Sequence, residues 1–269
     1  MWQQLDDLDF ADDIALLSHS LQQMQSKTSD LNGLARSVGL KIHAGKSKIL
    51  RIGAKSDNQV TLDNTPLEEV SSFTYLGSIV DNQGGTDADI KTRIAKARTA
   101  FSQLHKVWNA SKISLKTKLR LFNSNVKSVL LYGCETWKTT DSCTKKIQSF
   151  VNGCLRKSLK IKLQDRVKNE EIWERTGQVP MREQIGRRKW RWIGHTLRKP
   201  VTSTTRQALQ WNPQGARGRG RPRETWSRCV EKEMHGMDYT WRELGKISQD
   251  RKKWKSLICG LYPVNGDGQ

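Results

Sequence analysis

Alternating apolar and acidic positions mark the beginning of the chain. The stretch LDFADDIALL, residues 8–17, places Asp12 and Asp13 between two apolar runs. Short apolar runs bounded by polar residues are typical of strands, so we expect strands at 5–10 and 14–17 with a tight turn at the aspartates. Buried carboxylates are costly unless they are paired or bind a cation. The pair is therefore expected either at an exposed turn or in contact with a metal ion.

The next segment has the spacing of a helix. Ser20 belongs to a residue type that caps helices, and Gly39 follows the last apolar position and is expected to end the helix. The apolar positions between them are Leu21, Met24, Leu31, Leu34 and Val38. Two further strands are predicted at 48–52 and 73–80.

From Thr86 onward the helical period dominates. Thr86 and Asp89 have the spacing of a capping box, and apolar residues at helical spacing continue to Leu104. Further helices are expected at 115–131, 141–160 and 181–198. The Gly/Arg-rich stretch GARGRGRPR, residues 215–223, predicts a linker, and two more helices are expected after it, ending near Cys259. The pattern as a whole predicts an α+β chain that is mostly helical after its first third.

The charge distribution indicates the class of partner. The 269 residues include 47 Lys and Arg against 27 Asp and Glu, a net charge of +20. Residues 1–89 hold 7 basic and 13 acidic residues, whereas residues 90–269 hold 40 and 14. Such a basic region attracts polyanions, and no apolar run reaches the length of a membrane span. We therefore expect a nucleic acid as partner and no membrane. The ten Trp residues can stack on bases or pack in a core.

The five cysteines form no CxxC pair, so we expect a reduced, intracellular chain in the nucleus or cytoplasm. Cys143 and Cys154 are eleven residues apart, which predicts two core positions of one helix. Cys229, His235 and Cys259 could be imagined as zinc ligands, but their spacing matches no zinc module.

Two basic segments hold the candidate nucleic-acid contacts. They are Arg187, Arg188, Lys189 and Arg191 in one predicted helix, and Arg217, Arg219, Arg221 and Arg223 in the linker. The helix could bury Ile185, Ile193 and Leu197 while its basic residues face phosphates. The linker has two interpretations that the sequence leaves open. It could lie in a narrow A·T-rich minor groove, or it could touch phosphates without sequence preference.

Six motifs follow one another in a fixed order. They are FADDIALLSHS (10–20), GLKIHAGKSKIL (39–50), FTYLGSIV (73–80), LLYGCETW (130–137), RWIGHTLRK (191–199) and GRPRETW (220–226). Over nearly the whole chain, this set resembles the C-terminal part of reverse transcriptases encoded by non-long-terminal-repeat retrotransposons. The resemblance implies part of a polymerase palm at 1–85, an antiparallel hairpin plus a helix. It implies an all-helical thumb-like segment at 86–178 and a basic helical tail at 179–269.

The same resemblance implies roles for three residues. Asp12 corresponds to the main metal-binding carboxylate and Asp13 to the supporting one, in a site where two Mg²⁺ ions promote nucleotidyl transfer. Lys46 matches the candidate general acid for the departing pyrophosphate, with Lys48 as a nearby alternative. Lys46 can equally be a solvated loop lysine. His43 replaces the asparagine that is usual in this turn, and we expect it to face solvent.

Polymerases of this family carry a third carboxylate on an earlier palm strand, and fingers before it. Only eleven residues precede Asp12, so we expect an incomplete magnesium site and a chain that is inactive alone. The partners implied are an RNA template and a DNA primer or target. The alternative is a non-catalytic protein dedicated to binding DNA or RNA.

Overall fold

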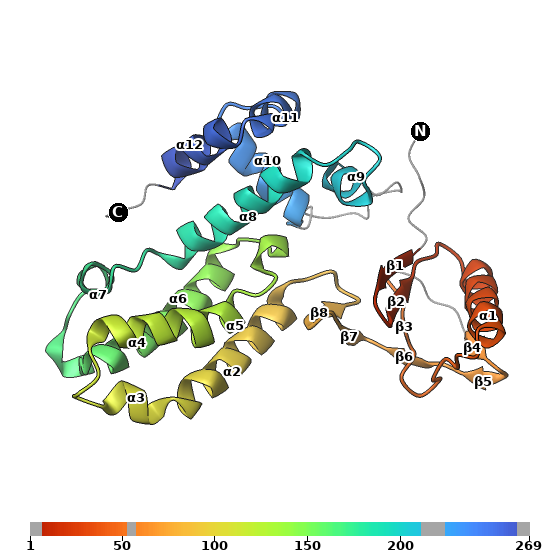
Figure 1. The fold of residues 1–269 in the computed structure, drawn as a ribbon, viewed down its shortest axis with the longest axis horizontal. Helices are drawn as coiled ribbons and strands as arrows, with labels where there is room; N and C mark the ends of the chain where they lie inside the picture. The colour runs from red at the N-terminus through yellow and green to blue at the C-terminus, as the bar shows by residue number, and fades with distance from the viewer. Residues whose placement is uncertain (1–6, 53–57, 211–223, 263–269) are drawn as a thin grey trace. The chain divides into compact units, whose positions relative to one another are not determined.

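The computed structural model describes residues 7–52, 58–210 and 224–262 (Figure 1). The chain divides into two compact units, Met1–Asp89 and Ile90–Gln269. The first unit contains small sheets and one long helix, and the second is helical throughout its described part. The sequence predicted this mixture of strands and helices. The three-part division at 85/86 and 178/179, and the assignment of a palm and a thumb, remain predictions.

The first unit consists of paired short strands around one helix. Its strands are β1 (Asp7–Phe10), β2 (Asp13–Leu16), β3 (Lys48–Leu50), β4 (Thr61–Leu62), β5 (Thr65–Pro66), β6 (Glu68–Val70), β7 (Ser72–Tyr75) and β8 (Ser78–Asp81). The pairs β1–β2, β4–β5 and β7–β8 are antiparallel hairpins, whereas β3 pairs with β6 in parallel. The predicted strands around the Asp pair and at 48–52 are thus confirmed within one or two residues at their described ends.

Helix α1 (Leu21–Ser37) begins as predicted. The Ser20 side chain accepts a hydrogen bond from the backbone N–H of Gln23 at 3.2 Å. The helix packs against a small core of Val60, Leu62 and Leu67. Only part of its apolar stripe is buried, since Leu34 and Val38 are 67% and 70% exposed.

Polar contacts replace apolar packing further along α1. The Gln25 side chain donates to the Thr61 carbonyl at 2.9 Å and accepts from the Thr61 N–H at 2.8 Å. Asn32 donates to Asp63 at 2.7 Å. Part of the face of α1 toward β4 and the turn after it is therefore polar, which the apolar spacing did not indicate.

The single strand predicted at 73–80 is wrong. Leu76 and Gly77 both have positive φ, 47° and 79°, and form the two-residue loop between β7 and β8. Positive φ at both central residues is the requirement of a type I′ hairpin turn. Leucine rarely adopts this conformation, so the sequence FTYLGSIV reads as one continuous strand.

The second unit consists of helices of very different lengths. They are α2 (Asp87–Gln103), α3 (His105–Asn109), α4 (Leu115–Leu121), the π-helix η1 (Phe122–Lys127), α5 (Ser128–Leu130), the 3₁₀-helix η2 (Cys134–Thr136), α6 (Asp141–Leu159), the 3₁₀-helix η3 (Leu163–Asp165), α7 (Asn169–Thr176), α8 (Met181–Leu197), α9 (Thr204–Gln210), α10 (Trp226–His235), α11 (Trp241–Gln249) and α12 (Arg251–Leu261). The helices predicted at 115–131, 141–160 and 181–198 are confirmed, although the first contains the π-helical turns of η1.

Two local predictions in this unit need correction. Three helices, α10, α11 and α12, stand where two were expected, because Asp238 at positive φ and the Thr240 capping box separate α10 from α11, and Asp250 caps α12. The capping box at Thr86 does not form. The Thr86 hydroxyl has no hydrogen-bond partner in the described part of the chain, and the Asp89 carboxylate accepts from the Ile79 N–H at 3.0 Å.

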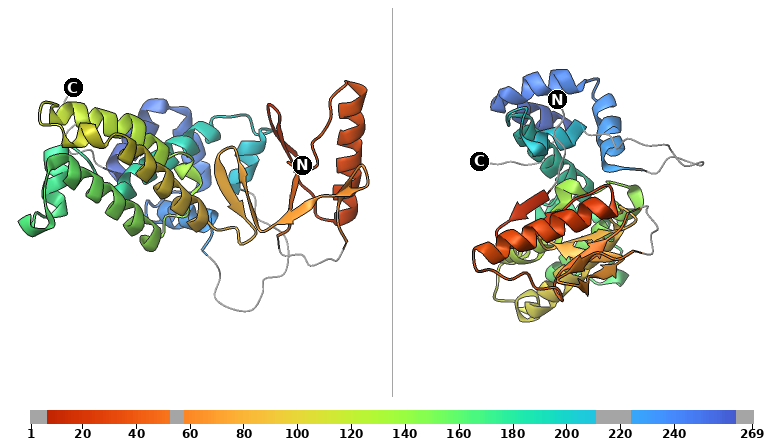
Figure 2. Two further views of the ribbon diagram at one scale, coloured as in Figure 1. Left: turned by 90° about the horizontal axis from the view of Figure 1, so that it is seen from below. Right: turned by 90° about the vertical axis from the view of Figure 1, so that its right-hand side faces the viewer.

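Helix α8 contributes to two separate hydrophobic cores of this unit. Met181 and Ile185 belong to the first core, which includes buried or partly buried residues of α2 to α7. Trp190, Ile193 and Leu197 belong to the second, which includes residues of α9 to α12. Figures 1 and 2 show α8 lying between the α4–α6 helices and the α10–α12 group. The predicted burial of Ile185, Ile193 and Leu197 is confirmed.

Two glycines let the C-terminal segment approach the backbone of α8. A Cβ atom on Gly194 would lie 2.0 Å from Nε1 of Trp254, and one on Gly186 would lie 2.4 Å from the ring of Tyr262. The Trp254 indole donates to the Trp190 carbonyl at 3.0 Å. Such contacts leave no space for a larger residue, so Gly194 of the RWIGHTLRK motif has a packing role.

Candidate functional site

The Asp pair lies at the tip of the β1–β2 hairpin. Ala11 and Asp12 form the two-residue loop, with Ala11 at φ 55°, and Asp13 is the first residue of β2, opposite Phe10. A positive φ at the first loop residue is the feature of a type II′ turn, where glycine is usual. Both aspartates are exposed. The tight turn is where the sequence predicted it, and it presents two adjacent carboxylates to solvent, which is one of the two placements that the sequence left open.

The faces of this hairpin are apolar as well as acidic. Directly paired residues share a face, so Asp13 lies on the same face as Phe10 and Leu8. Phe10 is 63% exposed, Leu8 40% and Ile14, on the other face, 46%. In the described chain this hairpin is therefore not covered by a core.

Contacts from two other elements hold the base of the hairpin. The Tyr75 hydroxyl of β7 donates to the Leu8 carbonyl at 3.0 Å. The Lys27 ammonium of α1 donates to the Leu17 carbonyl at 2.7 Å. The structure thereby joins the hairpin that carries the FADD motif to the FTYLG motif, which lies more than sixty residues later in the chain.

Lys46 forms no ion pair with an acidic side chain in the part of the chain that the structure describes. Its side chain is exposed, and its backbone N–H donates to the His43 carbonyl at 3.0 Å in a turn. Across the described residues, no hydrogen bond or ion pair joins Lys46 to Asp12 or Asp13. His43 is exposed in the same turn, as expected. The alternative, Lys48, forms an ion pair with Glu68 on β6, which neutralises its charge.

The donor set at the hairpin does not by itself fit a two-metal site. Two divalent ions need more carboxylate ligands than the pair can supply. Among the described residues, no group of three or more His, Cys, Asp or Glu side chains is arranged to hold a metal ion. The two carboxylates of Asp12 and Asp13 alone are thus too few to hold two magnesium ions.

The structure changes the interpretation of the basic residues on α8. Lys189 is fully buried, and its ammonium donates to Glu233 Oε1 at 2.5 Å and to the Thr139 hydroxyl at 3.1 Å. The Trp190 indole donates to the other Glu233 oxygen at 2.8 Å. This placement corrects the prediction that Lys189 contacts nucleic acid, because its charge is neutralised inside the second core.

The three arginines of the same segment differ in availability. Arg187 donates to the Tyr262 carbonyl at 3.0 Å, and Arg188 donates to the Leu131 carbonyl at 3.3 Å, so both help to hold neighbouring segments. Arg191 is exposed. Of the four predicted contacts on α8, Arg191 has the placement that phosphate binding requires. Arg217, Arg219, Arg221 and Arg223 lie outside the described residues.

Other basic residues are exposed on the helices and were not singled out by the sequence. They include Lys91, Lys96 and Arg98 on α2, Lys116 and Arg120 on α4, Lys145, Lys146 and Lys157 on α6, and Arg251, Lys252, Lys253 and Lys255 on α12. A signal was available for α12, since RKKWK follows Asp250, a residue type that caps helices.

The cysteines are free thiols. Cys134, Cys143, Cys154 and Cys229 are buried, and Cys259 is exposed. The expected core placement of Cys143 and Cys154 on one helix, α6, is confirmed. Burial raises the pKa of Cys134 and that of Cys154 to about 12. Cys229 donates to Glu224 at 3.5 Å, and burial followed by this contact raises its pKa.

Within the described ranges, no helix combines the length and the apolar character needed to cross a bilayer.

Comparisons with known proteins indicate an origin. The family Domain of unknown function DUF6451 matches residues 100–132, from the end of α2 to just beyond α5. A Caenorhabditis elegans protein, named as an uncharacterized transposon-derived protein, is 26% identical over 266 residues, which cover 94% of this chain and 95% of the relative. No solved structure matches the chain. The chain is thus similar to a transposon-derived protein along both compact units.

Proposed function

We propose that this chain is a nucleic-acid-binding protein of transposable-element origin. Its N-terminal unit is a remnant of a reverse-transcriptase palm, and its helical unit provides the binding surface. The observation that carries the binding proposal is the excess of exposed basic side chains on the helical unit. Residues 90–269 hold 40 basic and 14 acidic residues, so most of the basic charge lacks an acidic counterpart in the unit.

The position of some of these charges favours binding over stability. Helix α12 begins with three exposed cations, Arg251, Lys252 and Lys253, against one carboxylate, that of the N-cap residue Asp250. The N-terminus of a helix carries partial positive charge, so each cation there costs about 0.3–1 kcal/mol of stability. An arrangement that is unfavourable for the helix is explained by an external polyanion, which these cations would contact at the helix end.

Two observations support the proposed origin. The relative that matches along nearly the full length is a transposon-derived protein. The six ordered motifs resemble reverse transcriptases of non-long-terminal-repeat retrotransposons, and the hairpin that carries the first motif contacts the third motif where Tyr75 donates to the Leu8 carbonyl. In the intact polymerase, Asp12 and Asp13 would bind Mg²⁺, which activates the primer hydroxyl and stabilises the leaving pyrophosphate. That reaction needs further ligands beyond those of the described residues.

The test is the binding of the full-length chain to duplex DNA and to an RNA–DNA hybrid at several salt concentrations. Neutralising Z phosphates gives a slope of about −0.9Z in a plot of log K against log salt on B-form DNA. Six contacts would therefore lower the affinity roughly a thousandfold between 50 and 200 mM salt. The Asp12→Ala, Asp13→Ala double variant should bind as well as the unmodified chain.

A chain that shows no affinity at low salt would refute the proposed function. A second part of the experiment concerns the arginines of the linker. Replacing Arg217, Arg219, Arg221 and Arg223 with alanine should weaken binding to all sequences alike and flatten the salt dependence. A loss confined to A·T-rich duplexes would instead support the minor-groove interpretation.

A further inference from the structure

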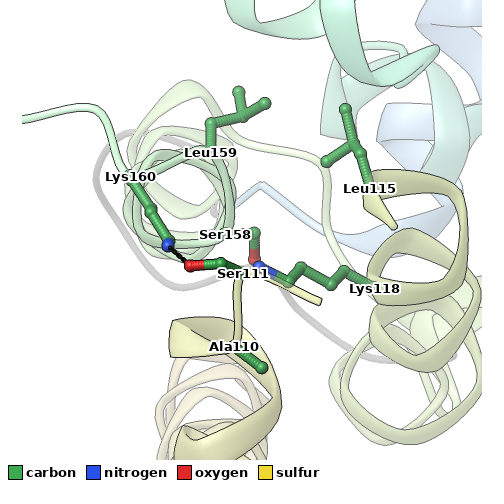
Figure 3. Close-up of a pocket in the computed structure, with 7 residues that line it drawn as sticks. All are labelled: Ala110, Ser111, Leu115, Lys118, Ser158, Leu159 and Lys160. Carbon is green, nitrogen blue, oxygen red and sulfur yellow. Dashed lines mark hydrogen bonds between the residues drawn. The ribbon is translucent and has the colours of Figure 1, made fainter. Parts of the chain in front are cut away.

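A pocket of about 250 Å³ lies where the α3–α4 connection, α4 and the end of α6 meet (Figure 3). Its polar lining consists of Ser111, Lys118, Ser158 and Lys160, and its remaining lining residues are apolar. Two cations thus line the pocket, and no carboxylate does. The helices therefore place two positively charged side chains at one pocket. None of the lining residues comes from the two basic segments that the sequence analysis singled out, 187–191 and 217–223.

Lys118 is a buried cation without an acidic partner. The residue is 4% exposed, and its ammonium donates to the Trp108 carbonyl at 2.9 Å. No ion pair with a carboxylate is formed by Lys118 in the part of the chain that the structure describes. Two of its three N–H groups remain for another acceptor. Burial, and then the nearby charge of Lys160, lower the pKa of Lys118. A buried ammonium is costly unless an anion compensates it.

Lys160 and Ser111 provide further donors. The Lys160 ammonium donates to the Ser111 hydroxyl at 2.7 Å, as Figure 3 shows. Since Ser111 Oγ accepts this bond, its own O–H is free to donate to a third group. Ser158, by contrast, donates to the Cys154 carbonyl at 2.9 Å and has no second proton to offer. Three side chains therefore hold unused donors at one small pocket.

The size and lining of the pocket indicate the kind of anion. Its volume is below the range of about 300–1,000 Å³ that is usual for drug-sized ligands. No aromatic residue lines it, so it offers no surface on which a base could stack. These features favour a compact oxyanion over a nucleoside.

We propose that Ser111, Lys118 and Lys160 bind one phosphate group of a nucleic-acid backbone, an inference that rests on the function proposed above. The contact is independent of base sequence, and it adds one neutralised phosphate to the binding surface. It also offsets the cost of burying Lys118, because the phosphate oxygens take the place of the missing carboxylate.

Lys160 has a second role that the test must separate from phosphate binding. It is the C-terminal cap of α6 at φ 58°, where the helix dipole attracts a cation. Loss of this role would lower stability but would not change the number of phosphates bound. The informative variants are therefore Ser111→Asp, which gives Lys160 an internal carboxylate partner, and Lys160→Asn, which tolerates positive φ.

The matched control is Ser149→Asp, which adds the same charge at an exposed position of α6 outside the pocket. Binding to a duplex oligonucleotide is measured for each folded variant across a salt series. We expect Ser111→Asp and Lys160→Asn to reduce the salt slope by about one, because one phosphate contact is lost. Ser149→Asp should leave the slope close to that of the unmodified chain. Equal effects of Ser111→Asp and Ser149→Asp on the slope would overturn the proposal that the pocket binds a phosphate. The proposed nucleic-acid binding would still stand in that case, provided that the unmodified chain binds the duplex.

A second measurement does not depend on nucleic acid. A ligand that binds the folded state raises Tm, so inorganic phosphate should raise Tm more for the unmodified chain and Ser149→Asp than for Ser111→Asp. General salting effects act on all variants alike. An equal rise in all three would overturn the pocket. A further outcome is that inorganic phosphate raises Tm as expected while the unmodified chain binds no oligonucleotide. In that case the pocket binds phosphate, but both the assignment of that phosphate to a nucleic-acid backbone and the proposed function fail.

Discussion

Lys189 and Arg191 are two residues apart on α8 and lie in opposite environments. Lys189 is fully buried against Glu233, whereas Arg191 is exposed. Removal of one partner of a buried ion pair is costly because the other charge remains uncompensated. The sequence alone could not separate the two residues, since Glu233 lies 44 residues away and only the packing of α10 on α8 brings it close.

Thiol reactivity distinguishes individual side chains in the same way. The thiolate is the reactive form of cysteine, and a pKa of about 12 for Cys134 and Cys154 leaves roughly one thiol in ten thousand ionised at pH 8. We therefore expect a single rapidly reacting thiol, Cys259, when the native chain is treated with a disulfide reagent at pH 8. The remaining cysteines should react after unfolding in denaturant.

The control for this prediction is Cys259→Ser, which should abolish the rapid phase. A rapid phase that persists in this variant would show that one of the buried cysteines is accessible.

At the scale of elements, the contact between α8 and α12 depends on the absence of a side chain. Overpacking a core usually costs about 1–3 kcal/mol. A methyl group on Gly194 would lie 2.0 Å from Trp254, within van der Waals overlap. We expect Gly194→Ala to lower the free energy of unfolding by about 1–3 kcal/mol or more. Urea denaturation measures this difference.

Gly153→Ala is the matched control. Gly153 also lies inside a helix, α6, but a Cβ atom there would meet no other atom within 4 Å. Alanine is more favourable than glycine in a helix by about 0.5–1 kcal/mol, so this variant should be more stable than the unmodified chain. Equal stability of the two variants would contradict the close packing of α12 on α8.

The helices that the sequence predicted best are those with long, regular apolar spacing. Helices α1, α6 and α8 are each seventeen residues or more, and each carries enough repeats to define its period. Short elements such as α3 and α9, with five and seven residues, have too few apolar positions for a period to emerge. The β7–β8 turn was missed for another reason, because its conformation places Leu76 at a positive φ.

At the scale of the whole molecule, the two units differ in what the sequence could reveal. The position of the Asp pair at a hairpin turn was predicted, because a hairpin tip is defined by neighbours in sequence. The pocket at Lys118 was not, since Ser111 and Lys160 are 49 residues apart and meet only through the packing of α4 and α6. Contacts of this kind have no local signature in a single sequence.

The proposed palm remnant leads to a prediction about catalysis. Two carboxylates supply too few ligands for two metal ions, so we predict that the chain extends a primer on an RNA template no better than the Asp12→Ala, Asp13→Ala double variant. The assay compares the two proteins with Mg²⁺ at equal concentration. Magnesium-dependent synthesis that the double variant lacks would show that the site is complete and that the chain is a polymerase.

The sharing of α8 between two hydrophobic cores has a consequence for cooperativity. Met181 and Ile185 stabilise one core and Trp190 and Ile193 the other, along one continuous helix. Proteins open in contiguous cooperative units, and we expect the two cores that α8 joins to open as one such unit. Loss of either core would release half of the helix and weaken the other core. A ligand bound to α12 would therefore protect the amides of α6 from hydrogen exchange without touching them.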